Sequence, residues 1–319
     1  MINKLKYYIS KGTEPYTNLA IEKYLFDNVD DNCYILYLWQ NKNTVVIGQN
    51  QNPWTECKCS LLESEGGRLV RRLSGGGAVY HDLGNLNFTF ISTTDNMDTA
   101  LNTEVIISAC NMTGIKRELT GRNDITADGK KFSGNAFYNS GGKSYHHGTL
   151  LISSDKEKLQ RYLTPPKSKL ESKGVKSVKS RIVNLSELSE NLSVEDMRGL
   201  MIESFKKTFG LSAEEIPDVG SEKICNDAEK FKSWEYIYGN TFPFTASFEH
   251  SFPWGHINLQ LKANNGIITD TRTYTDALDT TLPEKINTAL TGCRFTKKDM
   301  LSAISRMGIY PELIDLIDI

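Results

Sequence analysis

The sequence predicts a mixed α+β fold. Helical and strand-like segments interleave without the regular alternation that a doubly wound parallel sheet requires. Short runs rich in β-branched and aromatic residues, at 34–39, 44–48 and 87–91, indicate strands. Asp128-Gly129 and Asn264-Asn265-Gly266 are typical of tight turns between strands. Antiparallel hairpins and separate helices therefore account for the pattern better than repeated βαβ units.

Apolar residues at helical spacing predict five helices before residue 210. They are expected over 17–28, 54–65, 99–113, 155–163 and 193–209. The last is the best marked, because Ser193 can cap its first turn and Gly210 can end it. Two further strands are expected after Asp128-Gly129, at 130–138 and 145–152, with a turn at 139–142 between them.

From about residue 246 the pattern indicates a second, smaller unit. Ile257, Leu259 and Leu261 alternate with polar residues, as in a strand with one buried face. Helical patterns follow at 283–290, 297–306 and 311–317. We therefore expect two domains, residues 1–245 and residues 246–319, the second within the size range of small domains.

Composition narrows the class of protein. The chain has 319 residues, a net charge of −2, 39% hydrophobic and 24% charged residues, so it is an ordinary globular protein without the overall basic charge of a nucleic-acid binder. Its six cysteines form no Cys-x-x-Cys pair, which favours reduced thiols. No apolar run can cross a bilayer and the first residues do not resemble a secretory signal. We expect a monomeric cytoplasmic protein that binds neither membrane nor nucleic acid.

The segment from Arg71 to Asp82, RRLSGGGAVYHD, is the most informative part of the chain. Three consecutive glycines are costly, so such a run indicates that something approaches the main chain closely. The guanidinium of arginine matches phosphate and carboxylate oxygens. The segment lacks the Gly-Lys-Ser/Thr of a P-loop and the spaced glycines of a dinucleotide fold. It is either an anion-binding loop between two strands or a plain hairpin loop.

A second candidate segment covers residues 167–181. It carries six basic residues against one acid and shows no helical period. Such a run is either a solvated surface segment or a cationic lid over an anionic ligand.

Eight short motifs follow one another along the chain. They cover residues 14–22, 71–82, 83–90, 121–124, 131–136, 146–151, 173–181 and 234–239. Together they resemble the lipoate-protein ligase family, in its long bacterial form with a C-terminal accessory domain, over nearly the whole chain. The resemblance implies a catalytic domain related to biotin ligases and class II aminoacyl-tRNA synthetases.

The resemblance also implies a reaction in two steps. Lipoate and ATP, with Mg²⁺, would give lipoyl-AMP and pyrophosphate. The lipoyl group would then pass to a lysine of a lipoyl domain, in 2-oxoacid dehydrogenase acyltransferase subunits or the glycine-cleavage H protein. The sequence does not rank acyl chain lengths, lipoyl sources or carrier proteins.

Site residues are carried over from the family's motifs. Lys131 matches the family's essential lysine and would be catalytic, touching both the phosphate and the acyl group. The proposed ATP and adenylate contacts are Arg72, Gly77, Ala78, Val79, Tyr80, Asp124, Lys131, Lys179 and Arg181. The proposed lipoate contacts are Arg72, Ser74, Gly75, Gly76, His81, Lys131 and His147. Asp124 is also the candidate ligand for Mg²⁺.

Each role has a simpler alternative. Asp124 could cap a turn, and His81 and His147 could be structural histidines on strands. A lipoyl chain needs an apolar slot, for which the candidates Tyr37, Trp39, Val45, Val79 and Phe88 could equally be core residues.

Two other functions remain open from the sequence. One is an ATP-independent octanoyl or lipoyl transferase of the same fold, which would use a cysteine acyl intermediate. Cys110 lies on a predicted apolar helix face and the six cysteines lie outside the substrate motifs, which favours the ligase. The other is a non-catalytic protein that binds a ligand, or RNA through the basic segment. The presence of Lys131 disfavours an inactive pocket.

Overall fold

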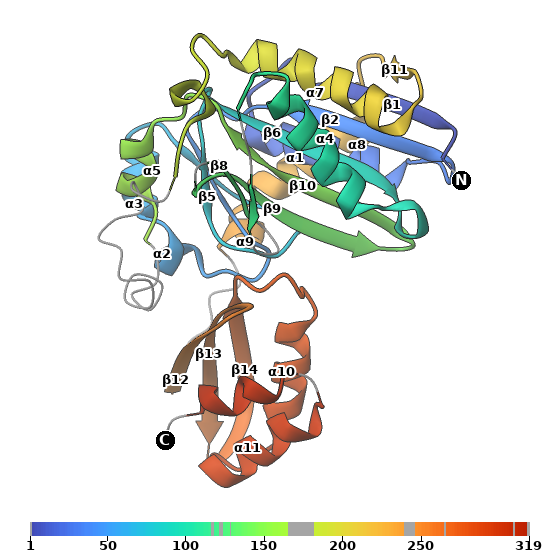
Figure 1. Ribbon diagram of the computed structural model, residues 1–319. Coiled ribbons are helices and arrows are strands. Elements are labelled where there is room, and N and C mark those ends of the chain that lie inside the picture. The colour runs from blue at the N-terminus through green and yellow to red at the C-terminus, as the bar shows by residue number, and fades with distance from the viewer. Residues whose placement is uncertain are drawn as a thin grey trace.

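The computed structural model describes residues 2–115, 118–120, 124–127, 129–164, 182–238, 246–264, 266–308 and 310–317. Helices and strands are mixed in the larger group of elements, and a smaller group that begins with β12 follows it (Figure 1). The predicted α+β class is therefore confirmed. None of the described helices is long and apolar enough to span a lipid bilayer.

A large sheet organises the first group. Its order within the described residues is β11-β1-β2-β6-β10-β9-β8-β7. The strands span Lys4–Ile9 (β1), Cys33–Trp39 (β2), Asn85–Thr93 (β6), Glu118–Thr120 (β7), Asp124–Ala127 (β8), Lys130–Ser140 (β9), Lys143–Leu151 (β10) and Ala213–Glu215 (β11). β1 pairs in parallel with β2 and β11, and the other pairs are antiparallel.

Helices cover both faces of this sheet. Helices α1 (Pro15–Asp27) and α8 (Glu222–Lys232) contribute to the core on one face, and α4 (Thr99–Asn111) and α7 (Val194–Phe209) to the core on the other. Side chains alternate along β2, so that Tyr37 and Trp39 join the α1 side while Leu36 and Leu38 join the α4 side. Ser193 caps α7 and Gly210 ends it with a φ of +65°, as predicted.

A small sheet packs on the α1 side. It has the order β4-β3-β5, with β3 at Thr44–Ile47, β4 at Arg68–Arg71 and β5 at Val79–His81. The glycine run joins β4 to β5, so it lies between strands as the sequence predicts. Helix α5 (Lys156–Tyr162) packs against β5, and the short helix α9 (Trp234–Ile237) against β4. The 3-10 turns η1 and η3 span Thr94–Asn96 and Leu185–Glu187.

The helix expected over 54–65 is broken in two, α2 (Pro53–Glu56) and α3 (Cys59–Ser64). The break has a backbone cause. The amide of Lys58 donates to the carbonyl of Tyr162 at 2.9 Å, and the amide of Thr164 donates to the carbonyl of Glu56 at 2.9 Å. A strand-like contact between distant segments thus replaces one helical turn.

The smaller group has a core of its own. Strands β12 (Ala246–Phe252), β13 (Gly255–Asn264) and β14 (Ile267–Thr275) form an antiparallel sheet. Helices α10 (Leu282–Leu290) and α11 (Lys297–Arg306) and the 3-10 turn η4 (Pro311–Leu316) complete it. Ile257, Leu259 and Leu261 are fully buried, as their alternation predicts. The end of β14 reaches the larger group, because the amide of Thr275 donates to the carbonyl of Asn50 at 2.7 Å.

Candidate active site

Close backbone packing explains two residues of the glycine run, Gly75 and Gly76. A Cβ at Gly48 would lie 2.2 Å from the carbonyl oxygen of Gly76, and one at Gly75 would lie 2.3 Å from that of Ala277. Gly76 has a φ of +89°, in the region that favours glycine. Its amide donates to the carbonyl of Ala277 at 3.3 Å. The close approach that the sequence predicted is made here by main chain from the loop after β14.

The side chain of Arg72 fixes the conformation of this loop by hydrogen bonds. Its Nε donates to the Oγ of Ser74 at 2.9 Å, and its Nη2 donates to the carbonyls of Gly75 at 2.6 Å and Gly77 at 2.9 Å. The side chain is buried, and this burial lowers the pKa of the guanidinium to about 10. In this structure Arg72 positions the loop, and its expected contact with an anionic ligand stays a prediction.

Arg71 acts in the same way on a neighbouring segment. Its Nη1 donates to the carbonyls of Gly48, Gln49 and Gln51, and its Nη2 to the carbonyl of Ile237 at 2.6 Å. Burial also lowers the pKa of Arg71 to about 10. Arg71 therefore connects the small sheet to α9.

A chain of buried hydrogen bonds runs from Ser74 into the sheet. The Oγ of Ser74 lies 2.7 Å from the Nε2 of His147, whose Nδ1 lies 2.8 Å from the Oε1 of Glu22. The same oxygen accepts from the hydroxyl of Thr89 at 2.7 Å, and Thr89 accepts from the indole of Trp39 at 3.1 Å. The predicted lipoate contacts Ser74 and His147 are thus brought together.

Sequence reasoning did not single out Glu22 and Thr89. Glu22 is 2% exposed, on the apolar face of α1. An acidic residue among the apolar positions of a helix, inside the 14–22 motif, was a signal that could have found it.

Lys131 lies at the start of β9. Its Nζ is 2.6 Å from the Oδ1 of Asp124, and both side chains are almost half exposed. A Cβ at Gly134 would lie 3.0 Å from this Nζ, so the ammonium lies directly over Gly134. A Cβ at Gly76 would lie 3.8 Å from the Cβ of Ala136, two residues further along β9. Lys131 and the glycine loop therefore share one face of β9.

The remaining loop residues differ in burial. Gly77, Ala78 and Val79 are partly buried, whereas Tyr80 is buried and donates its hydroxyl to Asn43 at 3.0 Å. His81 is also buried, and burial lowers its pKa to about 3, helped by Arg72 and His147. The imidazole of His81 is therefore neutral at physiological pH.

The expected slot residues divide between the two faces of the sheet. Tyr37, Trp39 and Val45 lie on the α1 side, the same side as His147 and the glycine loop. Phe88 lies on the α4 side with Phe90, in the core, which is the alternative that the sequence left open for it. Its neighbours in β6, Asn87 and Thr89, face the α1 side instead, because successive side chains alternate.

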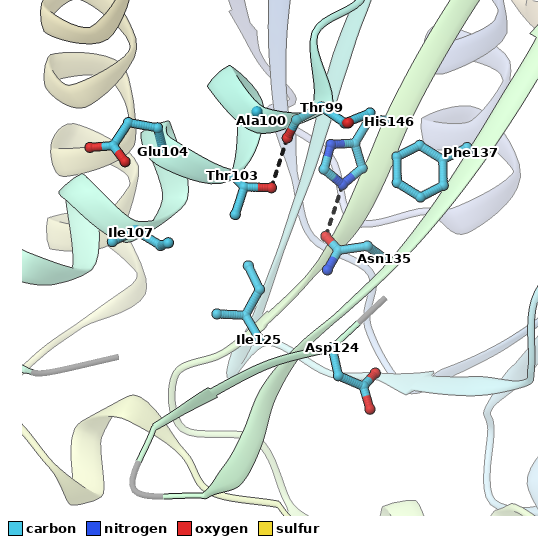
Figure 2. Close-up of a pocket in the computed structure, with 10 residues that line it drawn as sticks. All are labelled: Thr99, Ala100, Thr103, Glu104, Ile107, Asp124, Ile125, Asn135, Phe137 and His146. Atoms are coloured by element: carbon cyan, nitrogen blue, oxygen red, sulfur yellow. Dashed lines mark hydrogen bonds between the residues drawn. The ribbon is translucent and has the colours of Figure 1, made fainter. Parts of the chain in front are cut away.

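A cavity of about 300 Å³ lies on the α4 side, between α4 and strands β8, β9 and β10 (Figure 2). His146 lines it, with its Nε2 3.0 Å from the Oδ1 of Asn135, and burial lowers the pKa of His146 to about 3. Thr103 donates to the carbonyl of Thr99 at 2.7 Å on the opposite wall. Of the predicted site residues, Asp124 alone borders this cavity.

Lys179, Arg181 and the rest of the basic segment 167–181 lie outside the described residues. Among the described residues there is no cluster of three or more His, Cys, Asp or Glu side chains that could hold a metal ion. A single carboxylate already paired with Lys131 does not make a resident metal site. Cys110 is fully buried in the α4-side core, as expected for a structural thiol.

Comparisons with known proteins agree with this arrangement. The model of the lipoyl protein ligase A/B catalytic domain matches residues 14–206, and that of the bacterial lipoate protein ligase C-terminus matches residues 241–317. A lipoate-protein ligase A of Psychrobacter cryohalolentis is 38% identical over 326 residues, covering 99% of this chain and 96% of its own. The chain therefore belongs to the lipoyl protein ligase A/B family.

Solved structures give the same result. LipL1 of P. falciparum, in complex with lipoate, has a TM-score of 0.84 and 30% identity, covering 98% of this chain and 97% of its own. A bipartite lipoate protein ligase of Thermoplasma acidophilum, solved in a study with its E2 lipoyl domain, has a TM-score of 0.65 and 25% identity. It covers 77% of this chain and 100% of its own.

Proposed function

We propose that this protein is an ATP-dependent lipoate-protein ligase. In the first step, a carboxylate oxygen of lipoate attacks the α-phosphorus of ATP, the bond to the β-phosphate breaks, and lipoyl-AMP and pyrophosphate form. In the second, the ε-amine of a lysine attacks the acyl carbon, AMP leaves, and the amine gives up a proton. The family, and relatives named lipoate-protein ligase A, support this activity.

The position of Lys131 is the structural observation that most supports this activity. Two anions must meet in the first step, so catalysis depends on fixed positive charge and on orientation. The ammonium of Lys131 is partly exposed, lies over a glycine, and shares a face of β9 with the glycine loop. It can neutralise the α-phosphate in the first step and polarise the acyl carbonyl in the second.

The glycine loop would supply the nucleotide contacts. Main-chain N–H groups of Gly77, Ala78 and Val79 suit phosphate oxygens, because these residues are only partly buried. The side chain of Tyr80 is engaged in the core, so a contact from this residue would use its backbone. Lys179 and Arg181 remain predicted contacts to the adenylate from outside the described residues.

Lipoate would extend from Lys131 along the α1 side of the sheet. Ser74 and His147 border this face, and Trp39 offers a broad apolar ring. Gly75 and Gly76 would approach the carboxylate end, where Arg72 adds positive potential even while it holds the loop.

The metal and the partners follow from the same proposal. Mg²⁺ would arrive bound to ATP, with Asp124 as the candidate protein ligand. Residues 1–245 would form the catalytic domain and 246–319 the accessory domain. The acceptors would be lipoyl domains of 2-oxoacid dehydrogenase acyltransferase subunits or the glycine-cleavage H protein. A solved relative studied with its E2 lipoyl domain supports this class of partner.

Incubation with lipoate, α-labelled ATP and an unmodified lipoyl domain tests the proposal. We expect labelled lipoyl-AMP, pyrophosphate and a mass gain of one lipoyl group on the carrier. Omission of ATP is the control, because a transferase that uses a cysteine would modify the carrier from an acyl-carrier donor without it. Carrier modification that needs no ATP would contradict the ligase assignment.

A further inference from the structure

Two buried N–H donors on the α1 side of the sheet have no acceptor within the described part of the chain. One is the Nδ2 of Asn87 on β6 and the other is the Nε2 of His81 on β5. The residues are 1% and 3% exposed. A buried donor without an acceptor costs about 1–3 kcal/mol of folding stability. Two such donors in one place therefore indicate that a ligand with hydrogen-bond acceptors binds there.

The surrounding network fixes the Nε2 of His81 as a donor. Asn18 donates its Nδ2 to the Oδ1 of Asn41 at 3.0 Å, which leaves the Nδ2 of Asn41 to face His81. The Nδ1 of His81 lies 3.3 Å from this Nδ2 and accepts from it. Because the ring is neutral, its single proton is then on Nε2.

The amide of Asn87 is paired on one side only. The Nδ2 of Asn85 donates to the Oδ1 of Asn87 at 2.8 Å, so the unpartnered atom of Asn87 is its amide nitrogen. The Oδ1 of Asn85 is also unpartnered and borders the same strand end. Both free donors border Trp39, since Asn87 is its direct neighbour across the strands and the ring centroids of Trp39 and His81 are 6.0 Å apart.

Strand register connects this point to Lys131. Trp39, Asn87 and Thr149 are direct neighbours across β2, β6 and β10. The amide of Gly134 on β9 donates to the Oγ1 of Thr149 at 3.3 Å, and the ammonium of Lys131 lies over Gly134. Neighbouring strands are about 4.8 Å apart, so Asn87 is roughly 10 Å from Gly134. An extended eight-carbon acyl chain held at Lys131 by its carboxylate spans about this distance.

We propose that Asn87 and His81 select the acyl substrate by its far end, favouring lipoate, whose disulfide sulfurs carry lone pairs, over a saturated chain such as octanoate. The inference rests on the proposed function, because it takes the carboxylate to be held at Lys131. A terminal methyl group accepts no hydrogen bond and would leave both donors unsatisfied. A dithiolane sulfur accepts weakly from them and also packs well against the indole of Trp39.

The test measures kcat/KM for pyrophosphate release with lipoate and with octanoate. The wild-type protein should prefer lipoate by roughly tenfold, well below the discrimination shown by sites that bind a hydroxyl group. Asn87→Leu keeps the side-chain volume and removes the donor, so it should lose most of this preference, mainly by a lower KM for octanoate. His81→Phe should also lower the preference for lipoate. His81→Gln, which retains an N–H donor, should keep that preference.

Phe88→Leu is the matched control. It changes the adjacent residue of β6 on the opposite face of the sheet, so the ratio of the two kcat/KM values should stay at the wild-type level. Equal kcat/KM values for the two acids in the wild-type protein would overturn the inference. A folded Asn87→Leu variant with an unchanged ratio of kcat/KM values would also overturn it. The same holds for a variant in which the kcat/KM values for lipoate and octanoate fall by the same factor. Absence of pyrophosphate release with either acid in the wild-type protein would contradict the proposed function itself.

Discussion

The glycine loop and the start of β9 both carry positive charge, but they use it differently. Arg71 and Arg72 are buried, and their guanidinium groups donate to main-chain carbonyls. Lys131 is partly exposed, and its ammonium forms an ion pair with the carboxylate of Asp124. A buried cation whose N–H groups are hydrogen-bonded to the main chain stabilises the conformation of the site. A partly exposed cation can instead exchange its protein partner for a ligand.

This difference separates two roles that the residue types alone leave together. Arginine forms several hydrogen bonds in a fixed plane, which suits it to holding a loop of carbonyls. Lysine is a compact charge on a flexible stem, which suits it to following a phosphate as it changes geometry. We therefore expect arginine substitutions to act first on stability and the lysine substitution to act on rate.

The largest effect is expected for Lys131→Ala. Loss of one preorganised charged donor removes roughly 3–4 kcal/mol of transition-state stabilisation, so pyrophosphate release should slow by a factor of about 100–1,000. The free energy of unfolding should change by less than about 1 kcal/mol, because the ion pair is half exposed. Lys130→Ala, at the exposed neighbouring position, is the control and should keep the wild-type rate. A wild-type rate in Lys131→Ala would refute the catalytic role.

Arg71→Met should destabilise the protein by about 3 kcal/mol. It removes a buried charged donor and leaves the carbonyls of Gly48, Gln51 and Ile237 without it. Arg68→Met, three positions earlier on β4, removes an exposed pair with Glu14 and should cost less than about 1 kcal/mol. Urea unfolding measures both. Equal losses in the two variants would mean that the carbonyl contacts of Arg71 contribute nothing.

The buried His146 makes the folding stability depend on pH. The folded-state pKa of His146 is about 3, below the ordinary value of 6.5, so the unfolded chain binds its proton first as pH falls. The stability from this group is complete above pH 6.5 and is lost as pH falls towards 3. At pH 5 the loss is about 2 kcal/mol. His146→Gln should therefore lose less stability between pH 7 and pH 5 than the wild-type protein, and an unchanged loss would show that His146 does not titrate in this way.

The smallest effect is expected for Asp124→Asn. The asparagine keeps the shape and can still accept a hydrogen bond from Lys131, but the charge that holds the ammonium over Gly134 is lost. Pyrophosphate release should slow by about tenfold, equivalent to about 1.4 kcal/mol, with little change in unfolding. If Asp124 were instead the ligand of Mg²⁺ alone, saturating Mg²⁺ would restore the wild-type rate.

Local patterns predicted much of the fold. The caps of α7, the antiparallel pairing of β8 with β9, and the alternation of Ile257, Leu259 and Leu261 are set by neighbours in sequence, and the structure has all of them. The break between α2 and α3 could not be predicted, because it is caused by pairing with residues about one hundred positions away. The choice between slot and core for Phe88 stayed open, because strand register is needed to know which side a residue faces.

The candidate site shows the same division. Lys131 and the glycine run carry a recognisable sequence pattern, and the structure brings them to one face of β9. The hydrogen-bonded chain through Glu22 and Thr89 joins α1, β6 and β10, so it exists only after folding. The contact of Ala277 with Gly76 likewise depends on the packing of the smaller group of elements against the loop.

A crystal structure with a non-reactive analogue of lipoyl-AMP tests the central claim most directly, because it shows which cation contacts the phosphate. We predict that the Nζ of Lys131 lies within hydrogen-bonding distance of a phosphate oxygen, about 2.7–2.9 Å, while Arg71 and Arg72 keep their carbonyl partners. A phosphate held by the guanidinium groups, with the ammonium of Lys131 still paired only with Asp124, would contradict the account.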